Sequence, residues 1–128
     1  MSQATDGLPS SRTAGEWKQE ILRLYNRVNQ DLAGSGVTRQ RVHLGEDHVL
    51  IVAQHQRVPA LRTISSGDAA LGRWADVAIL DATKARLTEA LRALGVDVVS
   101  VLKDYDPDAE LAATVIVLGS PLAGCAGS

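Results

Sequence analysis

The chain has 128 residues, a length typical of one domain whose core is large enough to fold without disulfides or metal ions. Its net charge of -2 and pI of about 5.9 lack the positive excess expected of a nucleic-acid-binding protein. No long apolar run is present, so no transmembrane segment is predicted, and the lone Cys125 excludes an intrachain disulfide. Residues 1–13 lack the apolar core of a signal peptide, so we expect a cytoplasmic protein.

Composition divides the chain into three regions. Residues 1–13 are rich in Ser, Thr, Gly and Pro and predict a disordered N-terminal tail. Residues 120–128 are mostly small and predict a flexible C-terminal tail. Residues 14–119 are then expected to form a single α+β domain.

Apolar residues spaced three and four apart predict an amphipathic helix from Ala14 to about Leu32. Tyr25 widens this apolar stripe. Gly34 and Gly36 are expected to end the helix, because glycine accepts the left-handed C-cap conformation. The stripe is formed by Trp17, Ile21, Leu24, Val28 and Leu32.

Residues 39–44 and 48–54 predict a β-hairpin with a tight turn at residues 45–47. The second strand is apolar on both faces, which favours a central place in the sheet. His43, His48 and His55 lie in or beside this hairpin without the spacing of a zinc site. We therefore expect three solvated histidines.

Pro59 predicts the first turn of a short helix, and residues 65–68 are expected to break it. Asp68 is a candidate N-cap for a long helix that runs to about Leu94 and is closed by Gly95. Two apolar stripes follow this helix. One can cover the sheet, and the other predicts a dimer face or a contact with the first helix. The first stripe comprises Val77, Leu80, Leu87, Leu91 and Leu94, and the second Leu71, Trp74, Ala78, Ala82 and Ala85.

Two further strands are predicted at residues 96–102 and 112–118, connected by residues 104–110. The order of elements is therefore α-β-β-α-β-β. This order predicts an α+β fold, with a four-stranded, mostly antiparallel sheet and helices on one face.

Asp104, Asp106 and Asp108 have the alternate spacing that opens a calcium-binding loop. The rest of that motif is missing, because Ala109 replaces its glycine and Val115 its bidentate glutamate. The segment therefore predicts a structural turn, and we expect no metal site and no cofactor.

Four arginines are close to the hairpin in sequence. Arg39, Arg41 and Arg57 can gather near one end of the sheet, with Arg62 following on the short helix. Such a cluster can bind an anion, since each guanidinium presents a planar fork of donors, or it can simply form a solvated face. No Ser, His or Asp lies in a recognisable nucleophile context, so the sequence favours a protein that is not an enzyme.

Four stretches taken in order resemble the MpsC family, whose name comes from a component of a sodium-translocating, membrane-potential-generating system. Many of its members are known as a domain of unknown function. The stretches are residues 20–25 (EILRLY), 36–41 (GVTRQR), 59–63 (PALRT) and 104–109 (DYDPDA). The chain departs from the family pattern at Val37, where proline is usual, at Leu61, where an acidic residue is usual, and at residues 78–80, where basic and aromatic residues are usual.

The resemblance implies a non-catalytic accessory or regulatory protein beside a membrane ion-transport system. Together with the second apolar stripe, it leads us to expect a cytoplasmic homodimer at or near the membrane. Two alternatives stay open, namely a sensor of a small anion or nucleotide and, less favoured, an enzyme dependent on a divalent ion. The expected contact residues are Arg39, Arg41, Arg62, Asp104, Asp106 and Asp108.

Overall fold

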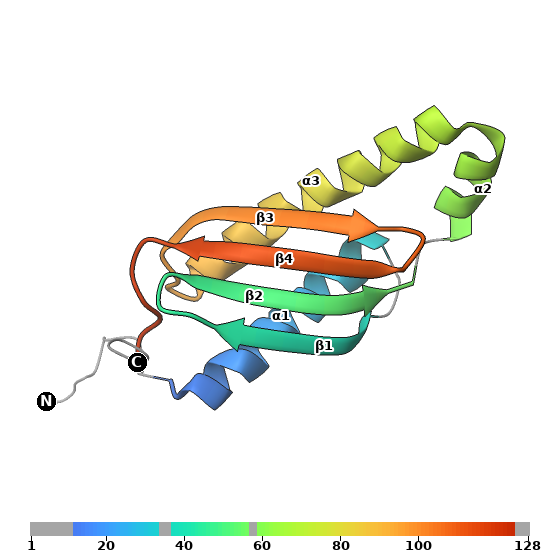
Figure 1. The fold of residues 1–128 in the computed structure, drawn as a ribbon. Coiled ribbons are helices and arrows are strands. Elements are labelled where there is room, and N and C mark those ends of the chain that lie inside the picture. The colour runs from blue at the N-terminus through green and yellow to red at the C-terminus, as the bar shows by residue number, and fades with distance from the viewer. Residues whose placement is uncertain (1–11, 34–36, 57–58, 125–128) are drawn as a thin grey trace, which may run out of the picture.

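The computed structural model describes residues 12–33, 37–56 and 59–124. These residues form three helices and four strands, which confirms the predicted α+β class. The short helix expected at Pro59 adds one helix to the predicted order (Figure 1). The elements are α1 (Ala14–Ala33), β1 (Val37–Leu44), β2 (His48–His55), α2 (Pro59–Gly67), α3 (Ala69–Ala93), β3 (Val98–Asp106) and β4 (Leu111–Leu118).

The strands form one sheet in the order β1-β2-β4-β3, and all neighbours are antiparallel. The prediction that β2 is central is confirmed, while β1 and β3 form the edges. Strand β3 is longer than expected, because Asp106 still pairs with Leu111 of β4. The prediction that residues 104–110 all belong to the connection is therefore wrong, since only residues 107–110 form the turn.

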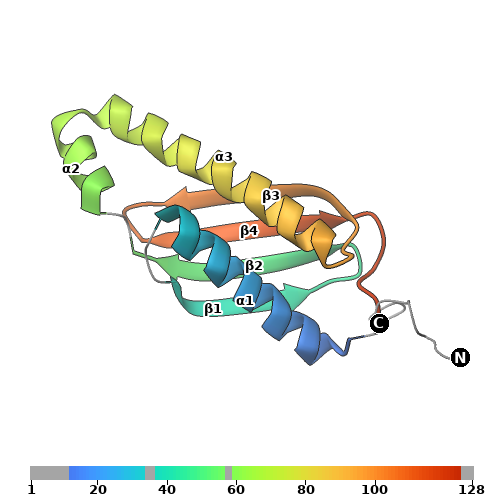
Figure 2. The same ribbon diagram turned by 180° about the vertical axis from the view of Figure 1, so that it is seen from behind.

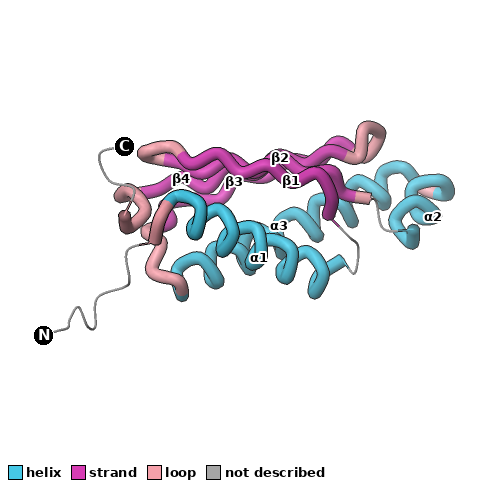
Figure 3. The backbone as a smooth tube through the Cα atoms, turned by 90° about the horizontal axis from the view of Figure 1, so that it is seen from below, coloured by secondary structure: helices cyan, strands magenta, loops and turns pink. Residues whose placement is uncertain are grey.

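Helices α1 and α3 lie side by side against one face of the sheet (Figures 2 and 3). The apolar stripe of α1 packs on the inward residues of the strands, as its spacing predicts. No helix among the described residues covers the opposite face of the sheet. The most deeply buried side chains of the core are Tyr25, Ile21, Ile51, Leu87, Leu91, Ile116 and Val49.

Both long helices begin at side-chain caps. Thr13 Oγ1 accepts a hydrogen bond from Glu16 N, and Glu16 Oε1 accepts one from Thr13 N, which is a reciprocal capping box. Hydrogen bonds to the Glu16 carboxyl from the backbone and the side chain of Thr13 lower its pKa. Asp68 caps α3 as predicted, since its Oδ1 accepts from Leu71 N at 3.1 Å. Gly95 follows α3 with a positive φ of 87°, which confirms it as the residue that closes the helix.

The N-terminal half of α3 extends beyond the sheet, and α2 folds back along it (Figure 1). We call residues 59–82 the α2–α3 arm. The two helices approach closely at Gly72, where a Cβ atom would lie only 2.9 Å from Ser65 Cα. The first apolar stripe of α3 therefore covers the sheet only in its C-terminal half, where Leu87 and Leu91 are buried.

The segment after β4 differs from the predicted flexible tail. Leu122 is only 4% exposed and belongs to the core, and the Trp17 indole N–H donates to Ala123 O at 2.7 Å. Residues 120–124 therefore pack against the start of α1. The predicted tails at residues 1–11 and 125–128, and the predicted cap at Gly34 and Gly36, lie outside the described residues.

Candidate functional site

A series of hydrogen-bonded polar side chains, some buried and some partly buried, crosses the interface between α1 and the sheet. Lys103 Nζ donates to Tyr25 Oη at 2.7 Å and to Thr114 Oγ1 at 3.2 Å. Tyr25 Oη lies 2.7 Å from His55 Nε2, and Tyr105 Oη donates to the His55 carbonyl at 2.9 Å. The Tyr25 hydroxyl therefore joins the Lys103 ammonium to the His55 ring.

Burial shifts the pKa of three of these side chains, namely Tyr25, His55 and Lys103. Burial, with a smaller contribution from the Lys103 charge, lowers the pKa of His55 to about 4. Burial alone lowers the pKa of Lys103 to about 8. Burial raises the pKa of Tyr25 to about 12, against a smaller lowering by a hydrogen bond with Thr114. At neutral pH the cluster therefore holds one partly buried positive charge, on Lys103, whose Nζ also lies 4.6 Å from the centre of the Tyr25 ring.

The prediction of three solvated histidines is wrong for His55, which is 8% exposed, while His43 and His48 are exposed as expected. His55 is the last residue of β2, and the alternation of that strand, with Val49, Ile51 and Ala53 inward, places it on the core side. That alternation was available in the sequence as the signal that His55 is buried.

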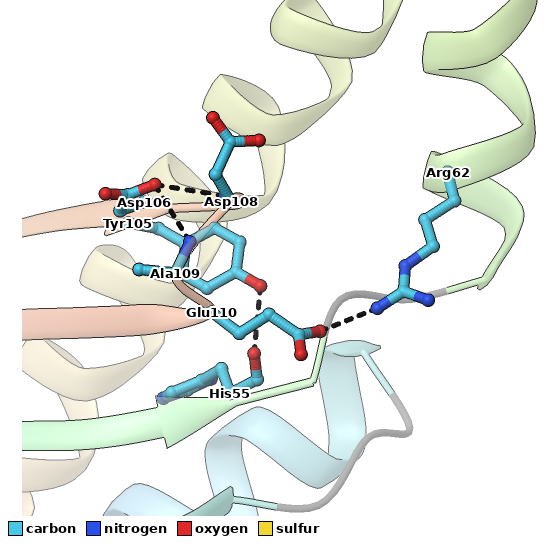
Figure 4. Close-up of polar contacts among 7 residues, drawn as sticks. All are labelled: His55, Arg62, Tyr105, Asp106, Asp108, Ala109 and Glu110. Atoms are coloured by element: carbon cyan, nitrogen blue, oxygen red, sulfur yellow. Dashed lines mark hydrogen bonds and ion pairs between the residues drawn. The ribbon is translucent and has the colours of Figure 1, made fainter.

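A cleft of about 460 Å³ lies between the α2–α3 arm and the turn from β3 to β4. Its polar lining mixes two arginines with three carboxylates. Arg62 Nη2 and Glu110 Oε2 form an ion pair at 2.7 Å across the cleft, between helix and turn (Figure 4). The lining residues are Arg62, Ser65, Ala69, Arg73, Asp76, Pro107, Asp108 and Glu110.

Asp106 holds the turn that forms one wall of this cleft. Its Oδ1 accepts hydrogen bonds from Asp108 N at 3.0 Å and Ala109 N at 3.2 Å (Figure 4). This is the turn role that the sequence predicted for Asp106. The Asp108 carboxylate points away from the turn, so the two carboxylates do not converge.

Replacing Asp106 by alanine is expected to lower the free energy of unfolding by about 1 kcal/mol, because two backbone donors of the turn lose their acceptor. Asp106→Asn keeps an acceptor oxygen and is expected to lose less than half as much. Urea denaturation of the two variants measures this difference. Equal stability of Asp106→Ala and the wild type would show that these hydrogen bonds do not hold the turn.

The structure does not place the six expected contact residues at one site. Arg41 and Asp104 lie in the two edge strands, β1 and β3, and Arg39 lies in a bulge of β1 with a positive φ of 50°. Asp106 is the last residue of β3. Only Arg62 and Asp108 line the cleft, and they lie on opposite sides of it. Arg57 lies outside the described residues.

Among the described residues, the side chains that commonly bind metal ions do not gather at one place. No group of three or more His, Cys, Asp or Glu within these residues is arranged to hold one. The helices of the described ranges likewise lack the combination of length and apolar composition that a bilayer span requires. What the site does offer is a mixed-charge cleft beside a helical arm, a geometry that suits a contact with another macromolecule.

Comparisons with family models, with curated proteins and with solved structures find no match to this chain.

Proposed function

We propose that this chain is a non-catalytic accessory or regulatory protein of the MpsC type, which acts in the cytoplasm as a homodimer beside a membrane ion-transport system. The kind of partner follows from the resemblance of the four sequence stretches. The observation that carries the proposal of a binding role is the α2–α3 arm, whose apolar side chains face solvent.

Three large apolar residues of the arm stay exposed: Leu71 by 49%, Trp74 by 70% and Val77 by 53%. They recur three residues apart on α3, so each lies next to the following one on the helix surface. Leu71 and Trp74 belong to the second apolar stripe, and Val77 belongs to the first. A partner that buries these side chains gains about 1.5–3 kcal/mol of binding free energy for each fully buried one. Tryptophan in particular is enriched among the residues that dominate binding energy at interfaces.

The surroundings of this apolar strip support a protein partner. Arg73 and Asp76 flank Trp74 in the sequence of α3 and line the neighbouring cleft. An apolar centre with a charged rim is the usual anatomy of a transient protein interface. The arm also stands clear of the sheet, so a partner can reach it without disturbing the core (Figure 1).

Replacing Trp74 by alanine is expected to reduce recovery of the partner at least about tenfold, the effect of losing a binding hot spot. The experiment is affinity capture of the tagged chain from its native host, with the soluble and membrane fractions analysed separately by mass spectrometry. Arg86→Ala is the matched control, because Arg86 is an exposed residue of the same helix, more than three turns away.

Recovery of an integral membrane transport subunit by the wild type and by Arg86→Ala, but not by Trp74→Ala, supports the proposal. Recovery of the chain alone from the soluble fraction contradicts the association with transport. A partner captured equally by all three proteins contradicts the role of the arm.

A further inference from the structure

We propose that the uncovered face of the sheet is the homodimer interface, and that two copies of this chain pack on it about a two-fold axis close to the strand direction. This inference rests on the homodimer of the proposed function and assigns its interface and symmetry. The surface is separate from the α2–α3 arm, so a membrane partner and a second copy can bind at the same time.

The centre of the uncovered face is apolar. In β2 the residues Val49, Ile51 and Ala53 point into the core, so Leu50 and Val52 between them point to the uncovered side. Strand register continues this apolar surface into the two strands beyond. Leu50 pairs with Val115 and Val115 with Leu102, while Val52 pairs with Ala113.

Several of these side chains are poorly shielded in the monomer. Leu102 is 56% exposed, Leu111 is 47% exposed, and Val99 at the bulge of β3 is 60% exposed. Strands β2 and β4 are thus apolar on both faces, a pattern typical of strands covered on both sides. One of those sides has no cover within the described residues.

The two edges of this face carry opposite charges. Arg41 of β1 pairs with Val52 of β2, and Val52 pairs with Ala113 of β4. Ala113 in turn pairs with Asp104 of β3. These four residues form one row across the four strands. Asp106, two residues beyond Asp104, adds a second carboxylate to the same edge.

This charge pattern selects one symmetry. A two-fold axis parallel to the strands, passing between β2 and β4, places β1 of one copy over β3 of the other. Arg41 of each copy then faces Asp104 of the other within the same row, and Val52 faces Ala113. A two-fold axis perpendicular to the strands would instead place β1 over β1, where Arg41 would face its own basic edge. Only the first arrangement is electrostatically self-complementary.

The surface shape fits the same arrangement. A hollow of about 290 Å³ lies beside Asp104, where the small side chain of Ala113 leaves room on the sheet. Its lining also includes Asp106, Leu111 and Val52. The guanidinium of Arg41 from the second copy can enter this hollow and meet both carboxylates, because its fork of donors suits paired oxygens.

The area is sufficient for a specific dimer. Four strands spaced about 4.8 Å apart and about 26 Å long present roughly 500 Å² in projection, and standing side chains raise the accessible area above that value. Two such faces bury on the order of 1,000 Å² or more, which reaches the lower limit of specific interfaces.

A charge exchange tests the interface and its symmetry together. Sedimentation equilibrium is expected to show a dimer of the wild type, and Arg41→Asp and Asp104→Arg are each expected to weaken it at least about tenfold through like-charge contacts. An equimolar mixture of these two variants is expected to recover dimers of about wild-type affinity. In the mixed dimer Asp at position 41 faces Arg at 104, and Arg41 faces Asp104. Arg86→Asp, an exposed charge change on α3, is the control and is expected to dimerise like the wild type.

A change at the apolar centre gives a second test. Leu102→Lys is expected to yield a monomer that, at concentrations below the dimer Kd, melts at the same temperature as the wild type, because Leu102 is mostly exposed in the isolated chain. Trp74→Ala is expected to leave the dimer intact. A wild-type monomer at near-millimolar concentration overturns the inference and the homodimer, but leaves the contact between the arm and its partner to be judged by partner capture. Dimers that resist Leu102→Lys, or a mixture no stronger than its components, overturn this interface alone.

Discussion

Replacing Tyr25 by alanine is expected to lower the free energy of unfolding by about 4 kcal/mol, which is typical of deleting a fully buried aromatic side chain. Tyr25 is 0% exposed and lies in the core between α1 and the sheet. The alanine variant loses the ring contacts. It also leaves His55 and Lys103 without their hydrogen bonds to the Tyr25 hydroxyl. Urea denaturation at neutral pH measures the loss.

Tyr25→Phe separates the two contributions. It keeps the ring and removes the hydroxyl that accepts from Lys103 and is hydrogen-bonded to His55, so it is expected to cost about 1–3 kcal/mol. The exposed Trp74 provides the matched control, because Trp74→Ala is expected to change stability by less than about 0.5 kcal/mol. A Tyr25→Phe variant as stable as the wild type would show that the buried chain of polar groups contributes nothing to stability.

The second large effect is a dependence of stability on pH. In the unfolded chain His55 titrates near 6.5, but burial lowers its pKa in the fold to about 4. Between these values the unfolded state binds more protons, so the free energy of unfolding falls as the pH drops. The full shift corresponds to about 3 kcal/mol, present above pH 6.5 and lost as the pH approaches 4.

At alkaline pH, Lys103 also makes the free energy of unfolding rise with increasing pH. Its pKa is lowered from 10.5 to about 8, so above pH 8 the folded chain releases a proton that the unfolded chain still holds. The free energy of unfolding is therefore expected to rise by about 2 kcal/mol between pH 8 and pH 10. Above pH 10 the raised pKa of Tyr25, about 12, opposes this rise, because the unfolded state then loses the tyrosine proton first.

Lys103→Met tests the origin of the alkaline rise. Methionine replaces the buried ammonium with an apolar side chain of similar length, so the variant is expected to be at least as stable as the wild type at pH 7. Its free energy of unfolding is expected to stay flat from pH 8 to pH 10. A rise of wild-type size in the variant would assign the effect to another group.

Much of the fold was predictable because its signals are local. The spacing of Trp17, Ile21 and Leu24 requires a helix, and Asp68 and Gly95 mark the two ends of α3 by their capping chemistry. The capping box of Thr13 and Glu16 also follows the sequence pattern of a helix start, although the predicted N-terminal tail included Thr13.

The inward position of the partly buried Lys103 was not predictable, because it depends on an irregularity of strand pairing. A strict period of two places Val98, Ser100 and Leu102 on one face of β3. The bulge between Val98 and Ser100 shifts that alternation by one residue, so that Val101 and Lys103 turn toward the helices. Local propensity does not report such a shift.

The positions of the candidate contact residues could likewise be predicted only in part from the sequence. Asp106 was predictable as a turn residue from the following Pro107, and it caps the turn in the structure. The position of Arg41 opposite Asp104 across the sheet depends on the register of three strand pairs, which lies beyond sequence spacing. Trp74 is exposed because the N-terminal half of α3 extends beyond the sheet. This extension is a tertiary property, which local sequence patterns do not predict.

The most direct test of the proposed accessory role is site-specific photo-crosslinking from position 74 in the living native host. A photoreactive amino acid replaces Trp74, and a second protein carries it at Glu89, an exposed position farther along α3. The account predicts that position 74, and not position 89, crosslinks to an integral membrane subunit of an ion-transport system. Crosslinks from position 74 only to a second copy of the chain, or the same products from both positions, would contradict it.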